Sequence, residues 1–366
     1  MKRREALAVR VGPLTIGGGA PVCVQSMTNT DPHDLKATVE QIQRLAAAGC
    51  ELVRVAVPDF EAARLLKKIK QAVAVPLVAD IHFDYRLALA ALEAGVDKLR
   101  LNPGNIGSKE RVAAVVAAAG ERGVPIRIGV NAGSLPRAVL EKHGGPTPAA
   151  MAEAALDQVR FMEDLGFTAL VVSVKASDVR RTVEAYRLVA RACPYPLHLG
   201  LTEAGLPERG LIHSSLAIGL LLVEGIGDTI RVSLTGDPEA EVRAAYEILR
   251  AMELRARGPP VIACPTCGRC QIDLARLATE VSRLARAYEE PWVIAVMGCV
   301  VNGPGEARHA DLGVAGGRGE GLIFRRGRPV RKVKEEDLLA ALAEEMAALA
   351  AEARTDRSPG KTEEGE

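Results

Sequence analysis

Two hydrophobic patterns alternate along residues 22–253 of the chain. Short runs rich in Val, Ile and Leu are typical of buried strands, and each is followed by an Ala- and Leu-rich stretch with apolar residues at helical spacing. The strand-like runs are Val22–Met27, Leu52–Val57, Leu77–Ile81, Lys98–Leu101, Ile126–Val130, Ala169–Val174, Leu197–Leu201 and Thr229–Leu234. The helix-like stretches are Leu35–Ala48, Glu61–Gln71, Arg86–Ala94, Lys109–Arg122, Met151–Leu165, Val179–Ala192, Ser214–Val223 and Pro238–Glu253.

Eight alternating strand–helix units predict an α/β fold in which the strands close into a (β/α)8 TIM barrel. A doubly wound open sheet is the competing architecture. The count of eight favours the barrel, and so does the lack of a Gly-x-Gly-x-x-Gly turn after the first run.

A linker at Arg255–Pro260 follows the barrel pattern, because its Gly-Pro-Pro sequence breaks any helix. We therefore expect a barrel domain over residues 1–255 and a smaller α/β domain over residues 256–354. The polar residues 355–366 are expected to be disordered. The second domain is predicted to contain a helix at Leu274–Tyr288, a strand at Trp292–Met297, a hairpin at Gly321–Lys334 and a helix at Glu335–Ala353.

Composition narrows the class of protein. The chain is 48% hydrophobic and carries a formal charge of +1, which does not favour nucleic acid or membrane as a partner. The N-terminus has no apolar run typical of a secretory signal, and Leu216–Val223 is shorter than the roughly 20 residues that span a bilayer. We expect a reducing cytoplasm, where clustered cysteines bind metal more often than they form disulfides.

Polar side chains stand at the carboxyl ends of the predicted strands, which face the active site in a TIM barrel. They are Ser26, Thr28, Arg54, Asp80, His82, Arg100, Asn102, Arg127, Asn131, Ser173, Lys175, Thr202, Glu203, Arg231 and Ser233. Arginines and a lysine that converge on one mouth repel each other unless an anion offsets their charge. Because guanidinium groups match phosphate oxygens, the pattern predicts a site for one phosphate or two adjacent ones.

Three further residues at the mouth are candidates with specific roles. Glu203, an acid among bases, would handle a proton or anchor a hydroxyl, or else neutralise an arginine. For His82 a scaffold role and a catalytic role are equally supported. Ser214 is expected to open a helix whose amino end adds anion-binding donors. The other histidines, at positions 33, 143, 198, 213 and 309, show no ligand spacing and are interpreted as structural.

Four of the seven cysteines cluster late in the chain, at Cys264, Cys267, Cys270 and Cys299, with Glu306 close behind. One interpretation is a zinc ribbon, and a second is a ferredoxin-like cluster on the C-x2-C-x2-C run. In a third, Cys264, Cys267 and Cys299 leave the fourth position to Glu306 or substrate. Spacing alone does not decide among them. A carboxylate is a weaker partner for cluster iron than a thiolate, so a glutamate-held iron would open to substrate.

Four motifs together resemble one enzyme family. They are Cys-Pro-Thr-Cys-Gly-Arg at 264–269, Gly-Cys-Val-Val-Asn-Gly-Pro-Gly-Glu at 298–306, Gly-Ile-Gly-Asp-Thr-Ile-Arg-Val-Ser-Leu-Thr at 225–235 and Val-Gln-Ser-Met-Thr-Asn-Thr at 24–30. The chain is similar in these motifs to the 4-hydroxy-3-methylbut-2-enyl diphosphate synthases, iron–sulfur enzymes of the non-mevalonate isoprenoid pathway. The resemblance implies a TIM barrel followed by a domain similar to sulfite reductase cluster domains. It also implies a [4Fe–4S] cluster held by Cys264, Cys267, Cys299 and Glu306, and it does not require Cys270.

The resemblance further implies a reaction, its partners and its site residues. The reaction is reductive ring opening of 2-C-methyl-D-erythritol 2,4-cyclodiphosphate, with reduced ferredoxin or flavodoxin as electron donor. A homodimer is implied in which the barrel of one subunit faces the cluster of the other. The implied substrate-binding residues are Arg54, Arg100, Asn102, Arg127, Asn131, Lys175, Arg231 and Ser233, with Ser214 added from its expected helix start, and the implied catalytic residues are His82, Glu203 and Glu306. His213 departs from the family, some of whose members carry lysine there.

Two other functional classes remain as alternatives. A zinc-stabilised TIM-barrel hydrolase of a phosphorylated metabolite would use the same cysteines as a closed metal site. A non-catalytic cluster sensor would need a basic surface for nucleic acid, which the near-zero net charge does not supply. The basic stretch Phe324–Lys334 either docks an acidic electron carrier or forms a solvated hairpin.

Overall fold

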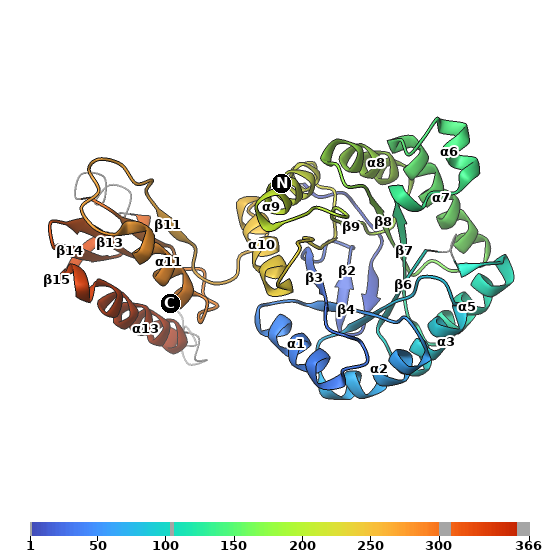
Figure 1. Cartoon of the computed structure of the whole chain (residues 1–366), viewed down its shortest axis with the longest axis horizontal. Helices are drawn as coiled ribbons and strands as arrows, with labels where there is room; N and C mark the ends of the chain where they lie inside the picture. Colours follow the sequence, from blue (N-terminus) through green and yellow to red (C-terminus); the bar gives the residue numbers. More distant parts are fainter. Residues whose placement is uncertain (1, 103–105, 300–308, 357–366) are drawn as a thin grey trace, which may run out of the picture. The chain divides into compact units, whose positions relative to one another are not determined.

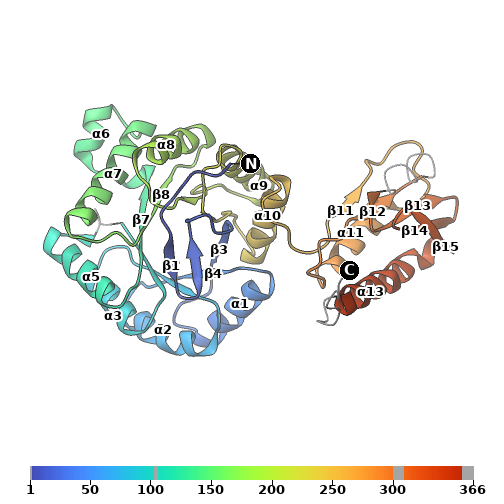
Figure 2. The same ribbon diagram turned by 180° about the vertical axis from the view of Figure 1, so that it is seen from behind.

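The computed structural model describes residues 2–102, 106–299 and 309–356. The chain divides into two compact units, Met1–Arg255 and Ala256–Glu366, which are described one at a time. Figures 1 and 2 show the eight-stranded sheet of the first unit inside a ring of helices, seen from opposite sides. Glu306 and its neighbours at 300–308 lie outside the described residues.

The first unit is a parallel barrel with strand order β8-β7-β6-β5-β4-β3-β10-β9. An isolated parallel bridge between Val172 and Leu197 joins the two ends of this order, so the sheet closes. The predicted TIM barrel is therefore confirmed, and the doubly wound open sheet is excluded. The strands are β3 (Cys23–Met27), β4 (Leu52–Ala56), β5 (Leu77–Asp80), β6 (Lys98–Leu101), β7 (Ile126–Asn131), β8 (Leu170–Lys175), β9 (His198–Leu199) and β10 (Thr229–Ile230).

Within the described part of the first unit, eight longer helices cover the barrel, and most begin where a side chain caps the first turn. Asp34, Asp59, Asp84, Asp178 and Asp237 each accept a hydrogen bond from a backbone N–H of the helix that follows. The helices are α1 (Leu35–Ala47), α2 (Phe60–Ala72), α3 (Tyr85–Glu93), α5 (Lys109–Glu121), α7 (Pro148–Asp164), α8 (Val179–Ala192), α9 (Pro207–Val223) and α10 (Pro238–Ala251). The short helix α6 (Arg137–His143) was not predicted.

The prediction that Ser214 opens a helix is wrong, because α9 begins at Pro207. Proline is tolerated in the first helical turn, where its missing N–H would have no partner inside the helix. Gly210 lies inside α9. An added Cβ there would stand 2.6 Å from Leu234 Cδ2, so this glycine serves close packing.

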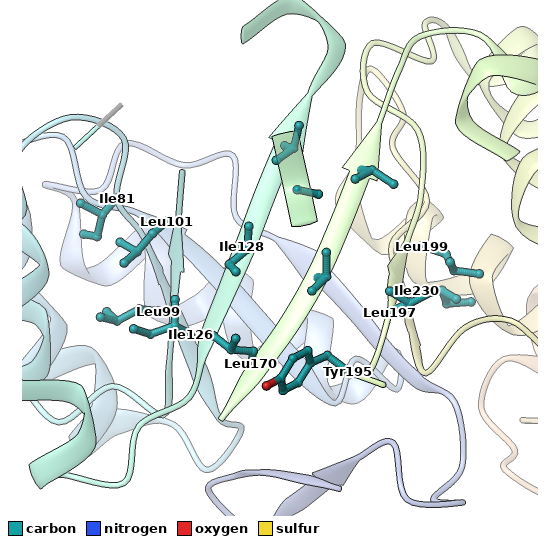
Figure 3. Packing of buried hydrophobic residues seen from close by; sticks show 14 of the residues in the cluster. Ile81, Leu99, Leu101, Ile126, Ile128, Leu170, Tyr195, Leu197, Leu199 and Ile230 are labelled. Carbon is teal, nitrogen blue, oxygen red and sulfur yellow. The ribbon is translucent and has the colours of Figure 1, made fainter. Parts of the chain in front are cut away.

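Side chains on the barrel strands alternate between two environments. One set points outward and packs against the helices, as Leu99, Ile126 and Leu170 show in Figure 3. The other set points to the barrel axis. At the amino-terminal end, Val11 and Ile16, from the hairpin of β1 (Val9–Val11) and β2 (Leu14–Ile16), pack with Cys23, Leu52 and Val78 and form an apolar floor. Above this floor the inward-facing positions are largely polar.

The second unit is a five-stranded sheet in the order β11-β12-β13-β14-β15, parallel over the first three strands and antiparallel over the rest. Its elements are β11 (Val261–Ala263), α11 (Leu274–Ala285), β12 (Ile294–Met297), β13 (Leu312–Gly317), β14 (Glu320–Arg325), β15 (Arg328–Lys334) and α13 (Leu338–Asp356). The predicted hairpin is β14 and β15. Sequence analysis missed β13 because it is rich in glycine. An added Cβ at Gly316 would stand 2.8 Å from Ile272, so that glycine serves packing.

Two end points in this unit differ from the prediction. The last helix begins as a 3-10 turn over Glu335–Asp337 before α13 starts. It then continues to Asp356 and so includes two residues that were expected to be disordered. Residues 357–366 of that predicted tail lie outside the described part of the chain. Among the described residues, no helix is both long and apolar enough to cross a membrane.

Candidate active site

Cationic side chains from neighbouring strands gather inside the barrel at its carboxyl end. In the sheet register Asp80 is opposite Arg100, Arg100 is opposite Arg127, and Asn131 is opposite Lys175. Arg100, Arg127 and Lys175 are buried, and Arg54 is partly buried next to them. The structure thus brings together the cationic residues that sequence analysis assigned to an anion site. We call Arg54, Arg100, Arg127, Lys175 and Arg231 the cation cradle.

Two glycines make room for the cradle. An added Cβ at Gly129 on β7 would stand 2.7 Å from Arg100 Nε, and one at Gly200, after β9, would stand 2.8 Å from Lys175 Nζ. Real Cβ atoms do not approach so closely, and each of these cations therefore lies across the backbone of a neighbouring strand. The missing side chains are what let two long cations lie inside a packed barrel.

Asp80 is the buried carboxylate at the centre of the cradle. Its oxygens lie 3.2 Å from Arg100 Nη1 and 3.7 Å from Arg54 Nε. Burial alone raises the pKa of Asp80, but Arg54, the His82 hydrogen bond and Arg100 outweigh burial and lower it. The carboxylate is therefore ionised at neutral pH and fixes two cradle arginines.

His82 extends this group toward solvent. Its Nε2 lies 3.2 Å from Asp80 Oδ2 and 3.1 Å from Arg100 Nη1, and half of its side-chain surface is exposed. A histidine in this position can meet a bound ligand and is at the same time oriented by the cradle.

Glu241 on α10 is a second buried carboxylate, and sequence analysis missed it. It accepts hydrogen bonds from Arg231 Nη2 at 3.0 Å, from the Leu234 backbone N–H at 3.0 Å and from Ser26 Oγ at 2.9 Å. It thereby fixes Arg231 to the barrel wall. A signal was present, because Glu241 shares the buried stripe of α10 with Ala245 and Leu249.

The cradle holds more positive charge than its own residues offset. Five cations face two carboxylates, and burial penalises each charge. Burial lowers the pKa of Arg54 to about 10; Asp80 acts in the opposite direction, and Arg231 and Arg100 lower the pKa further. Burial and the neighbouring cations likewise lower the pKa values of Arg127 and Lys175. Such repulsion is relieved when an anion binds.

Donor groups remain available for that anion. Arg127 donates from Nη1 to Ser173 Oγ at 2.6 Å, but its Nε and Nη2 have no hydrogen-bond partner among the described residues. The same holds for Arg100 Nε. Buried guanidinium donors are rarely left unpaired in proteins, so these atoms indicate where a ligand binds.

The remaining predicted residues divide into two groups. Asn102 and Asn131 meet at the turn around Ser134, where Asn102 Nδ2 donates to Ser134 Oγ and that hydroxyl donates to the Asn131 carbonyl, both at 3.3 Å. Glu203 is exposed in the loop after β9 with φ of 53°, a conformation that non-glycine residues rarely adopt and that occurs at functional sites. Ser233 is partly buried after β10. Ser214 is buried within α9, and no described contact joins it to the cradle.

The cysteine motifs meet in the second unit, at the carboxyl ends of the adjacent parallel strands β11 and β12. Cys264 Sγ accepts a hydrogen bond from the Gly298 backbone N–H at 3.3 Å, which places it beside Cys299 in the chain. Cys270 Sγ also packs on Gly298, where an added Cβ would stand 2.5 Å away. Its thiol donates to the Ile272 carbonyl at 3.3 Å. Cys267 is exposed, and Cys299 is buried.

These thiols suit a soft metal or an iron–sulfur cluster, because thiolate sulfur is the ligand that such centres prefer. Among the described residues, no three His, Cys, Asp or Glu side chains are already grouped as a metal site. The fit therefore rests on the donor chemistry and on Gly298, which lets sulfur atoms approach the β12 end closely.

Comparison with known proteins gives matches along most of the chain. A model described as "GcpE TIM-barrel domain" matches residues 6–246, and one described as "GcpE protein C-terminal domain" matches residues 260–348. A Geobacter sulfurreducens protein named 4-hydroxy-3-methylbut-2-en-1-yl diphosphate synthase (flavodoxin) is 58% identical over 94% of this chain and 98% of its own. A protein of the same name from Caldanaerobacter subterraneus is 57% identical over 94% and 97%.

Among solved structures, the barrel is similar to dihydropteroate synthase from Xanthomonas albilineans. The identity is 18% with a TM-score of 0.49, covering 68% of this chain and 100% of that one.

Proposed function

The chain belongs to the family of 4-hydroxy-3-methylbut-2-en-1-yl diphosphate synthases, and we propose that its cation cradle binds 2-C-methyl-D-erythritol 2,4-cyclodiphosphate. The resemblance seen in the motifs is confirmed, and the chain is an oxidoreductase of non-mevalonate isoprenoid biosynthesis. The comparisons give no support to the zinc hydrolase. The observation that carries the substrate proposal is the buried surplus of positive charge, because two adjacent phosphates would offset it.

The reaction fixes what the site must do. The bond between C2 and its ring oxygen breaks, the C3 hydroxyl leaves as water, and two electrons and two protons enter. The product is 4-hydroxy-3-methylbut-2-enyl diphosphate. Arg54, Arg100 and Arg127 would stabilise the negative charge that collects on the departing diphosphate oxygen. We assign Lys175, Arg231 and Ser233 to the same phosphates.

The groups around the cradle would orient the rest of the substrate. Asn102 and Asn131, held together through Ser134, supply amide groups at the ends of β6 and β7. His82 lies over Asp80 and Arg100 at the solvent edge, where it would contact a hydroxyl or a phosphate oxygen. Glu203, exposed and backbone-strained in the loop after β9, is assigned to a hydroxyl or to proton delivery. We do not assign Ser214 to the substrate. It lies inside α9, where it is a buried packing residue.

We assign a [4Fe–4S] cluster to Cys264, Cys267, Cys299 and Glu306. The approach of Cys264 to the Gly298 N–H at the β12 end supports the first and third of these ligands. Glu306 lies outside the described residues, and its role rests on the motif. When bound, such a cluster supplies the reaction's two electrons one at a time and a Lewis-acidic iron. We also assign the protein to a reducing cytoplasm, the compartment that suits such a cofactor.

We also propose a homodimer that uses the outer face of α9. Ile212, Leu216, Leu220 and Val223 recur at helical spacing on that face and are 61%, 51%, 46% and 55% exposed. Residues 210–223 contain no Asp, Glu, Lys or Arg. Cores of permanent interfaces are depleted of charge in the same way, so a second copy of the chain is the partner that fits.

A groove beside that face supports the same partner. It runs between α9 and α10 with a volume of about 490 Å³, and Leu211, Leu234, Ala244 and Ile248 are among the residues that line it. In the dimer, the barrel of one subunit would work with the cysteine unit of the other.

The test is anaerobic purification followed by metal analysis and turnover. We expect iron and acid-labile sulfide in a ratio near one, and conversion of the cyclodiphosphate with reduced flavodoxin or ferredoxin. Cys267→Ser is the matched control, expected to lose the cluster and the turnover together. Stoichiometric zinc with hydrolysis of the cyclodiphosphate, and no reduction, would overturn the proposal.

A further inference from the structure

Lys98 is a fully buried lysine beneath the cradle that the proposed chemistry does not use. It begins β6, two residues before Arg100, so both side chains point into the barrel. Its register partner is Val78, a residue of the apolar floor. The amine therefore lies one layer below the cradle, with the floor underneath it.

Lys98 Nζ has no hydrogen-bond partner among the described residues. Other buried polar atoms that share this condition include both side-chain amide atoms of Gln25, His198 Nε2, and Arg127 Nε and Nη2. Each of these side chains is at most 2% exposed. Groups of this kind are rare in protein interiors because each buried unpaired polar group costs stability.

The charged and titratable groups that face Lys98 are the cations Arg127 on β7 and Arg54 on β4, the Cys23 thiol on β3, and the His198 imidazole on β9. Burial raises the pKa of Cys23 to about 12, so it carries no negative charge at neutral pH. Burial and the surrounding cations hold the pKa of His198 well below its ordinary value, so it stays neutral. Neither group can pair with an ammonium ion.

Burial, and then repulsion by Arg127, lowers the pKa of Lys98 to about 7, even though Cys23 acts in the opposite direction. Lys98 shares this property with Lys175 of the cradle and differs from the cradle arginines, which hold their protons more strongly. Beneath the cradle, the Lys98 amine is the group whose charge can respond to a ligand above it.

We propose that Lys98 is a proton acceptor coupled to substrate binding, neutral while the cradle is empty and protonated once the diphosphate fills it. Two phosphate charges beside Arg54 and Arg127 cancel the repulsion that these cations exert on the ammonium form. The proton that Lys98 takes up comes from the solvent, and the buffer acid replaces it. The inference rests on the proposed function, because it takes the cyclodiphosphate as the anion.

The sign of the pH dependence follows from linkage. Below the pKa of the free enzyme, Lys98 is already protonated and contributes no slope. Between about pH 7 and the higher pKa of the complex, binding must take up a proton, and the dissociation constant rises up to tenfold per pH unit. Each phosphate of the cyclodiphosphate has a single, strongly acidic proton, so the ligand itself does not titrate in this range.

Calorimetric binding of the cyclodiphosphate to the oxidised holoenzyme, without reductant, measures the proton directly. Titrations at pH 8 in HEPES, Tricine and Tris, which differ in ionisation enthalpy, give the number of protons taken up. At pH 8 most of Lys98 is unprotonated in the free enzyme, because burial and Arg127 lower its pKa to about 7. The wild type should therefore take up more protons than Lys98→Met, with a difference that approaches one. His198→Gln is the matched control and should match the wild type.

Proton uptake that is unchanged in Lys98→Met, or lost in His198→Gln instead, would overturn the inference about Lys98. Tight binding in the same titrations would still support the proposed function. If the cyclodiphosphate does not bind the wild type, the inference and the proposed function are both wrong. Should Lys98→Met fail to fold, Lys98→Gln takes its place in the same titrations. A dissociation constant that rises toward tenfold per unit between pH 7 and 9 supports the coupling, and a constant value contradicts it.

Discussion

Replacing Asp80 with Asn would remove the buried carboxylate that Arg54 and Arg100 share, while preserving the shape of the side chain. Asp80 is 4% exposed, and its oxygens lie within 3.7 Å of both arginines. Loss of one member of a buried ion pair costs about 3–5 kcal/mol, because the remaining charges stay buried without compensation. For a unit of this size the midpoint of thermal unfolding should fall by about 6–20 °C.

The pH dependence of the free energy of unfolding provides a second test of this prediction. The pKa of Asp80 is lowered in the folded protein, so its contribution is complete above the pKa of about 4 that applies to the unfolded chain. It is lost as the pH falls through the lower pKa of the folded state. The stability gap between the wild type and Asp80→Asn should thus be constant from pH 5 to 8 and narrow only in acid.

Thermal unfolding of the ligand-free holoenzyme, followed anaerobically by far-ultraviolet circular dichroism, measures the effect. Asp84→Asn is the matched control from the following loop. Asp84 caps α3 and pairs with Arg86 at the surface, and asparagine caps helices about as well as aspartate. A midpoint for Asp80→Asn within 2 °C of this control would refute the reasoning that the cradle carries an uncompensated surplus of charge.

Four further predictions concern separate parts of the chain. Glu241→Gln should raise KM for the cyclodiphosphate about tenfold or more by freeing Arg231, and an unchanged KM would contradict this. Cys270→Ser should keep its iron content and its absorption spectrum, because its thiol hydrogen-bonds Ile272; an iron-free protein would make Cys270 a ligand. Leu216→Glu in α9 should yield monomers in analytical ultracentrifugation, whereas the isolated, equally apolar Leu165→Glu should not; dimers in both would remove α9 from the interface. Neutralising the exposed basic residues of the β14–β15 hairpin should lower kcat/KM for reduced flavodoxin and flatten its salt dependence, and salt-independent turnover in the wild type would exclude docking there.

The barrel could be predicted from sequence because buried parallel strands and amphipathic helices leave different periodicities, and eight repeats leave few alternatives. The same periodicity located Arg100 near the end of its strand, but Arg127, expected at a strand end, is the second residue of β7 and meets Arg100 through the sheet register. The position of Arg100 against Gly129 of the neighbouring strand depends on register, which the pattern of a single strand does not contain.

Glu241 shows where sequence analysis fails. Glu241 is on helix α10, but its partners are on other elements. Ser26 is on β3, and the Arg231 side chain and the Leu234 backbone N–H belong to the loop after β10. No local spacing links these positions. A lysine at the start of a strand is ordinarily exposed, so the sequence does not predict the burial of Lys98. Its burial follows from closure of the barrel above an apolar floor.

Gly129 and Gly200 carry no functional group, yet the shape of the site depends on them. At Gly129 no unusual backbone angle forbids a side chain, and the obstacle to alanine is Arg100, which occupies that volume. A saturation mutagenesis screen would therefore find these positions intolerant while every binding group remained in the gene. In this barrel the absence of side chains at Gly129 and Gly200 helps to determine which ligand fits, because it sets where Arg100 and Lys175 lie. A design that transfers the cation cradle to another scaffold must therefore transfer the two glycines as well.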